Sequence, residues 1–144
     1  MSKIGFASDH AGFELKEFVK QFIEQQGYAC VDFGCNAAES CDYPDFAHPL
    51  AVAIESGEVD LGIALCGSGN GMSMALNKHK GIRAAICWNK ELAQLTRMHN
   101  DANILVLPAR FISQAKTEEI IDIFLNTPFS GGRHQRRIEK IPII

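Results

Sequence analysis

Long apolar runs are missing from this sequence of 144 residues, and so is any strong excess of charge. No run approaches the 18 or so apolar residues of a membrane span, and the first residues, M-S-K-I-G-F-A-S, lack the apolar core of a signal peptide. The formal net charge of −3 gives no global field that would attract nucleic acid or an anionic membrane. We therefore expect a cytoplasmic protein with no membrane and no nucleic-acid partner, in which any basic patch is local.

The sequence also lacks the cysteine spacings of a disulfide scaffold or a zinc site. Its five cysteines are an odd number, and Cys66 and Cys87 fall in or at the ends of predicted strands, so we expect free thiols. The region richest in possible metal ligands holds Cys30, Cys35, Cys41 and His48, but no C-x-x-C pair. We therefore expect no metal site.

Short apolar segments alternate with amphipathic ones along the whole chain. Strands are expected at residues 3–7, 28–33, 61–65, 83–87 and 104–107, and helices from 13 to a stop at Gly27, over 44–56, 70–79 and 89–99, and from 113 onward. This alternation predicts a Rossmann-like α/β fold, in which residues 1–144 form one domain. The domain would be a three-layer α/β/α sandwich around a five-stranded, mainly parallel sheet. A domain of this length buries about 70% of its unfolded surface, which is enough for a self-sufficient core.

The most distinctive stretch is V-D-L-G-I-A-L-C-G-S-G-N-G-M-S-M, residues 59–74. A buried strand ends at Cys66, and alternating glycines follow before a helix that begins near Asn70. Glycines carry no Cβ, so backbone N–H groups can converge above Cys66 and form an anion or oxyanion cradle. The helix N-terminus favours the thiolate, which makes Cys66 a candidate base or nucleophile. The alternative is an ordinary strand-to-helix turn with a buried cysteine.

Other phosphate-binding and thiol motifs do not fit this loop. A dinucleotide fingerprint would need its third glycine where Met72 stands, and a Walker loop would need Gly-Lys-Ser/Thr. A thiol phosphatase would need arginine six residues after the cysteine, which is again Met72. We therefore expect no nucleotide cofactor.

Polar residues follow several of the predicted strands. Asp9 and His10 follow the first strand, Cys66 the third, Trp88 the fourth and Arg110 the fifth. In a parallel sheet, ligands bind outside the carboxyl ends of the strands. We therefore expect these groups to share one edge of the sheet.

Cations concentrate in a basic tail at residues 129–144. If the chain is helical after Gly132, Arg133 and Arg137 lie four residues apart on one face, a spacing that suits one small dianion. A solvated tail or a nucleic-acid contact would show similar residues, although interleaved aromatics are missing. His99, at a predicted helix end, is equally open to two interpretations, a partner for the helix dipole or a catalytic group.

Seven short motifs lie along nearly the whole chain. They are Ser8-Asp9-His10-Ala11-Gly12, Asp42-Tyr43-Pro44-Asp45, Cys66-Gly67-Ser68-Gly69-Asn70-Gly71, Asn77-Lys78, Gly81-Ile82-Arg83-Ala84-Ala85, His99-Asn100-Asp101-Ala102-Asn103 and Gly131-Gly132-Arg133-His134. In order and spacing this set resembles the type B ribose-5-phosphate isomerases. The resemblance implies a metal-independent enzyme without cofactor that interconverts ribose 5-phosphate and ribulose 5-phosphate through an enediolate, in the pentose phosphate pathway. It also implies a homodimer or a dimer of dimers, with active sites between subunits.

The resemblance assigns a role to each matching residue. Cys66 would be the base, and Ser68 with the loop amides would steady the enediolate oxygen, so that Gly67, Gly69, Asn70 and Gly71 surround the substrate. His99 would open the sugar ring with the help of Asp9, while Tyr43 and Asn100 hold sugar hydroxyls. His10, Arg133 and Arg137 would bind the phosphate, with Arg110 as a weaker candidate.

Two positions depart from the family pattern. Ser68 stands where many members carry threonine, which keeps the hydroxyl but frees its rotamer. Another branch places a glutamate base just after the glycine loop, where this chain has Met72, so the resemblance assigns the base to Cys66. Close relatives isomerise galactose 6-phosphate or allose 6-phosphate, and a non-catalytic sugar-phosphate sensor is a further alternative. The sequence leaves the length of the sugar open.

Overall fold

A single parallel sheet forms the centre of the protein, which we describe from a computed structural model over residues 2–143. Its strands are β1 (Lys3–Ser8), β2 (Ala29–Asp32), β3 (Leu61–Cys66), β4 (Ala84–Ile86) and β5 (Ile104–Pro108), in the order β2-β1-β3-β5-β4. All four strand pairings are parallel, so the predicted sheet is confirmed. From β1 the chain moves outward to β2 and then returns to β3 on the other side. Ligands bind outside the carboxyl ends of strands at such a reversal.

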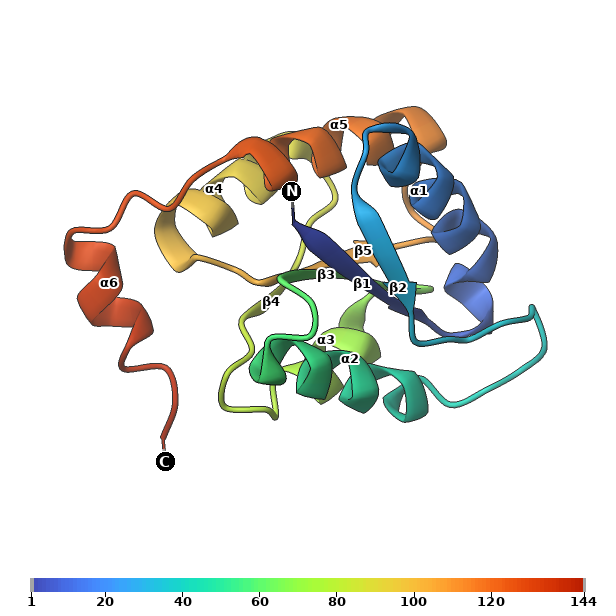
Figure 1. Cartoon of the computed structure of the whole chain (residues 1–144), viewed down its shortest axis with the longest axis horizontal. Coiled ribbons are helices and arrows are strands. Elements are labelled where there is room, and N and C mark those ends of the chain that lie inside the picture. The colour runs from blue at the N-terminus through green and yellow to red at the C-terminus, as the bar shows by residue number, and fades with distance from the viewer. Residues whose placement is uncertain (1, 144) are drawn as a thin grey trace.

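Helices cover both faces of this sheet, as the alternating pattern predicted (Figure 1). The helices α1 (Phe13–Gln25), α4 (Lys90–Asn100) and α5 (Gln114–Asn126) cover one face, and α2 (Pro44–Ser56) and α3 (Asn70–Leu76) cover the other. Each face has its own buried apolar core, one around Ile63, Leu65 and Phe124 and one around Leu50, Ala64 and Met72. The three-layer α/β/α sandwich is therefore confirmed.

Most described boundaries lie within one residue of the predicted ones, and the larger or explained differences are at α3, β4 and the C-terminal segment. The helix expected to reach residue 79 ends at Leu76, because the Asn77 side chain pairs with the backbone of Ala84, with N···O distances of 2.9 Å in both directions. The strand expected from 83 begins at Ala84, because the Arg83 N–H donates to the Asn103 side chain instead of a neighbouring strand. A short helix, α6 (Arg133–Ile138), follows α5. A helix after Gly132 is one of the possibilities that the sequence leaves open for this segment.

Two further features bear on function. A single turn of 3-10 helix, η1 (His10–Gly12), connects β1 to α1. Helix α6 stands apart from the sheet, beyond α4 in Figure 1.

Over residues 2–143 none of the helices is both long enough and apolar enough for a membrane span. All five cysteines are free thiols, as predicted.

Candidate functional site

Cys66 ends β3 beneath a loop of glycines, where the sequence placed it. The side chain is only 5% exposed, and its Sγ accepts a hydrogen bond from the Gly69 N–H at 3.2 Å. Gly69 has a φ of +83°, a conformation that glycine adopts without strain and that turns its N–H back toward the sulfur. The loop therefore directs a backbone donor at the sulfur of Cys66.

Residues that directly follow β5, a neighbour of β3 in the sheet, form hydrogen bonds with the glycine loop. The Ala109 N–H donates to the Cys66 carbonyl at 2.9 Å, and the Arg110 N–H donates to the Gly67 carbonyl at 3.0 Å. The Arg110 side chain lies over the loop, because a methyl group at Gly67 would lie 3.3 Å from one of its guanidinium nitrogens. The structure therefore brings a cation to the mouth of the glycine loop.

Tyr43 covers the end of the loop at Gly71. A methyl group at Gly71 would lie 2.5 Å from Cζ of the tyrosine ring, so only glycine permits this approach. The Asn70 N–H donates to the Ser68 hydroxyl at 3.3 Å, and the hydroxyl proton remains available for another acceptor. These contacts place the Ser68 hydroxyl and the Tyr43 ring at the same loop as the Cys66 thiol.

A cavity of about 550 Å³ opens beside the loop. Its lining residues come from the loop and from the elements that follow β4 and β5: Ser68, Asn70, Ile86, Trp88, Pro108, Phe111 and Lys116. Trp88 was expected at this edge, but Phe111 and Lys116 were missed. The sequence feature that could have indicated Phe111 was its position directly after Arg110. In the structure its side chain is 74% exposed and therefore is not part of the hydrophobic core.

Asp9 and His10 lie beside Cys66 because β1 neighbours β3 and ends at the same edge. The Asp9 carboxylate accepts from the N–H groups of Ala11 and Gly12 at 3.0 and 3.1 Å, and so caps η1. The His10 Nδ1 accepts from the Cys41 N–H at 3.3 Å. That bond requires an unprotonated Nδ1, which in the neutral ring leaves the proton on Nε2 as a donor. Asp9 and His10 therefore lie at the carboxyl edge of the sheet, as the strand positions predicted.

The remaining predicted site residues lie elsewhere in the chain. His99 and Asn100 end α4, and Asp101 follows as a left-handed cap with a φ of +45°. The Arg83 side chain donates to the carbonyls of Asn100 and Asp101 at 2.9 to 3.1 Å. Arg83 directly precedes β4, so this helix end lies at the amino edge of the sheet. The Asn103 carbonyl, which accepts from the Gly62 N–H near the start of β3, marks the same edge.

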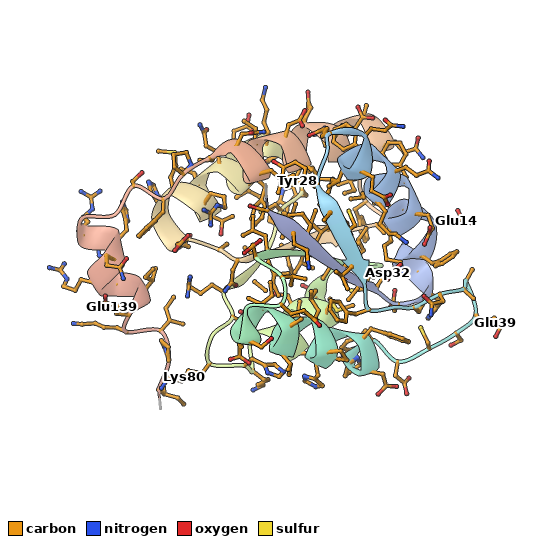
Figure 2. All side chains as sticks on the ribbon, in the orientation of Figure 1. Glu14, Tyr28, Asp32, Glu39, Lys80 and Glu139 are labelled. Atoms are coloured by element: carbon orange, nitrogen blue, oxygen red, sulfur yellow. The ribbon has the colours of Figure 1, made fainter. Side chains whose placement is uncertain are left out.

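The predicted residues therefore form two clusters. The glycine-loop cluster comprises Asp9, His10, Tyr43, Cys66 to Gly71 and Arg110, and the α4–α6 cluster comprises His99, Asn100, Arg133 and Arg137. From Gly62 to Cys66 the strand advances roughly 13 Å. Figure 2 shows Glu39, from the loop before Tyr43, and Glu139, which follows α6, at opposite sides of the molecule. The two clusters of one chain therefore lie at opposite edges of the sheet.

His134, for which no role was predicted, lies against the α4–α6 cluster. Its ring stacks on that of His99 with the centroids 4.2 Å apart and the planes inclined by 13°. Burial, followed by the positive charges of His99, Arg133 and Arg137, lowers the pKa of His134. The only sequence signal was its place directly after Gly131-Gly132-Arg133.

The described residues offer no metal site. Within residues 2–143 no three histidine, cysteine, aspartate or glutamate side chains converge in a way that could hold a metal ion.

The family model described as Ribose/Galactose Isomerase matches residues 4–141. The chain belongs to this family. A curated relative from Bacillus subtilis, a putative sugar phosphate isomerase, is 46% identical over 96% of this chain and 94% of its own length. The ribose-5-phosphate isomerase B of Escherichia coli is 42% identical over the whole of this chain and 97% of its own.

Solved structures agree with this membership. The ribose 5-phosphate isomerase of Thermotoga maritima has a TM-score of 0.97 at 52% identity, covering 99% of both chains. The Mycoplasma genitalium ribose-5-phosphate isomerase B, solved with bound ribulose 5-phosphate, has a TM-score of 0.92 at 42% identity, covering 96% of this chain and 93% of its own. The resemblance inferred from seven motifs is therefore confirmed.

Proposed function

We propose that this protein interconverts ribose 5-phosphate and ribulose 5-phosphate, as a cytoplasmic enzyme of the pentose phosphate pathway whose single domain spans residues 1–144. The supporting observation is the Gly69 N–H that donates to the Cys66 thiol at 3.2 Å within the glycine loop. Membership of a family whose relatives are named ribose-5-phosphate isomerase B supports the choice of reaction.

In the proposed mechanism, Cys66 moves a proton between two carbons. Its thiolate removes the proton from C2 of the open-chain aldose, which leaves an enediolate with its charge on O1. The proton of the C2 hydroxyl passes to O1, and the thiol returns its proton to C1 to give the ketose. Ser68 and the loop N–H groups other than those of Gly69 and Asn70, which already donate to Cys66 and Ser68, donate to the enediolate oxygen. Donors aimed at a developing oxyanion commonly provide the largest catalytic effect, and removing one costs about 100 to 1000-fold in rate.

The furanose ring must open before this step. His99 takes the proton of the C1 hydroxyl and passes it to the ring oxygen as the bond from that oxygen to C1 breaks, and Asp9 assists. Tyr43 and Asn100 hold sugar hydroxyls. His10, Arg133 and Arg137 bind the phosphate, and Arg110, which lies over Gly67, joins them at the mouth of the loop. The phosphate lies far from the reacting carbons, so its binding serves to orient them.

The separation of the two clusters supports an active site built from two chains. A homodimer would place the α4–α6 cluster of one subunit over the glycine-loop cluster of the other. A Cys66→Ala chain mixed with an Arg137→Ala chain should then recover activity, because one of the two sites in each mixed dimer is intact. No recovery in verified mixed dimers would contradict a shared site.

The test of the reaction uses two readouts. Wild type should convert ribose 5-phosphate and should also exchange the C1 proton of ribulose 5-phosphate with deuterated water, which NMR detects. Cys66→Ala should lose both activities while still binding the ketose. His99→Ala should lose turnover of the cyclic aldose but keep the exchange, since the ketose is already open. Cys30→Ala, a cysteine on the edge strand away from the loop, is the matched control and should resemble wild type.

A hexose 6-phosphate is the second candidate substrate, because the matching family model covers both ribose and galactose isomerases. Galactose 6-phosphate and allose 6-phosphate should therefore be assayed beside the pentose. Preference for a hexose would retain the mechanism and overturn the substrate. Binding of all three sugars without turnover would overturn the enzyme and favour a sensor.

A further inference from the structure

The ring of His99 is oriented by stacking. Among the described residues, no hydrogen bond holds either ring nitrogen of His99, whereas the His134 ring covers one face at a centroid distance of 4.2 Å. Most functional histidines are fixed through a hydrogen bond to one nitrogen. Here the stacked partner restricts the ring plane and leaves both nitrogens available for proton transfer.

The chain around His134 is shaped to bring it to this position. The Ser130 N–H donates to the Met98 carbonyl at 3.0 Å, which ties the segment to the last turn of α4. Gly131 and Gly132 follow with φ values of +68° and +59°, and together they turn the chain into α6. Without this glycine pair, α6 would not start against the end of α4. His134, its second residue, therefore lies on His99.

The charges around the pair favour an uncharged His134. Burial and then the cations of His99, Arg133 and Arg137 hold the pKa of His134 below its usual range. On the α4 side, Arg97 is paired with Asp101 at 2.9 Å, so that carboxylate is engaged. A protonated His134 would meet cations on α6 and, whenever His99 carries a proton, a second imidazolium in contact. His134 therefore presents a neutral aromatic face to His99.

We propose that His134 is a positioning residue for ring opening, whose ring holds the His99 imidazole in the plane in which it exchanges protons with the sugar. This inference rests on the proposed function, since His99 acts on the ring there. His134 itself touches no reacting atom. Its removal should therefore affect the step that His99 performs and spare the step that Cys66 performs.

Three variants of α6 test the proposal. His134→Ala removes the stacked face and should lower kcat for ribose 5-phosphate about 10 to 100-fold, because small misplacements of a catalytic group cost that much, while KM changes less than twofold. His134→Phe restores a neutral ring and should recover most of kcat. Arg136→Ala, an exposed neighbour on the same helix, is the matched control and should resemble wild type.

The deuterium exchange into ribulose 5-phosphate separates positioning from general damage. His134→Ala should retain wild-type exchange, as His99→Ala does. Equal losses of exchange and turnover, or an unchanged kcat, would overturn the proposal, as would failure of His134→Phe to recover turnover. Light scattering checks that all variants keep the wild-type assembly. Wild type that neither turns over nor exchanges its sugar phosphate would instead overturn the proposed function.

Discussion

Replacing Asp32 by asparagine should strongly destabilise the fold, because it leaves the buried Lys16 with only the partly exposed Glu17 carboxylate, at 3.9 Å, as a counter-charge. The Lys16 ammonium is completely buried, donates to both Asp32 carboxylate oxygens at 2.8 Å and also donates to the Cys35 carbonyl (Figure 2 labels Asp32). Lys20 donates to the same carboxylate at 2.8 Å from a half-exposed position. Removing one partner of a buried ion pair typically costs about 3 to 5 kcal/mol.

The converse substitution should cost less. Lys16→Met removes the buried charge and fills the space with an apolar chain. Asp32 then keeps Lys20 and the Gly34 N–H, which donates at 2.9 Å, while the Cys35 carbonyl loses a donor at a cost of about 1 to 2 kcal/mol. At about 3 °C per kcal/mol for a chain of this size, Asp32→Asn should lower Tm by about 10 to 15 °C and Lys16→Met by about half of that or less.

The pH dependence distinguishes this cause from simple loss of packing. Burial alone would raise the pKa of Asp32, but hydrogen bonds from Lys16, Lys20 and Gly34 outweigh it and hold the pKa below its usual range. A depressed carboxyl contributes its stability above its unfolded pKa of about 3.9 and loses it as the pH falls through the folded value. The difference between wild type and Asp32→Asn should therefore be full at pH 7 and shrink below pH 4.

Denaturant melts at several pH values and one protein concentration measure these differences. Asp122→Asn, an exposed carboxylate on α5, is the control and should change stability by less than about 0.5 kcal/mol. The reasoning is refuted if Asp32→Asn is milder than Lys16→Met at pH 7, or if its cost persists unchanged where the carboxyl is protonated.

Three further predictions concern the site and the thiols. Gly71→Ala should raise KM for the sugar phosphate with little loss of stability, because the new methyl group would lie 2.5 Å from the partly exposed Tyr43 ring and displace it. In a Tyr43→Ala background the same change should have no further effect on KM, and additive effects of the two substitutions would contradict the contact. Burial raises the pKa of the Cys87 thiol to about 12, and burial followed by the charge of Glu24 raises the pKa of the Cys30 thiol to about 11. Both thiols should therefore be unmodified after brief iodoacetamide treatment of the native protein at pH 7.5 and modified after unfolding, as measured by peptide mapping. Rapid native labelling of Cys87 would argue against its burial. Incubation with a chelator should leave turnover of ribose 5-phosphate unchanged, and recovery of lost activity on adding a divalent cation would show that a metal is required.

Local pattern was sufficient for the elements and for one half of the site. The five strands are short apolar runs whose alternation with helices favours parallel pairing, and the carboxyl ends of parallel strands meet at one edge. Asp9, His10, Cys66 and Arg110 follow such ends directly, so their grouping depends on their position in the chain. The end of α3 and the start of β4 were less predictable. At these boundaries the side chains of Asn77 and Asn103 form hydrogen bonds with the backbone of Ala84 and Arg83, which lie in other segments of the chain.

Contacts between distant segments decided the rest. The fold class, the glycine loop at Cys66 and the family could be predicted from the residues alone, because each depends on residue types at fixed spacing. The strand order, the Tyr43 ring over Gly71 and the separation of the α4–α6 cluster from the glycine loop became known only from the three-dimensional arrangement. The stacking of His134 on His99 belongs to the same group, since 35 positions separate the two residues and two glycines turn the chain back between them. Such approaches depend on the path of the whole chain through space, which no local pattern of residues encodes.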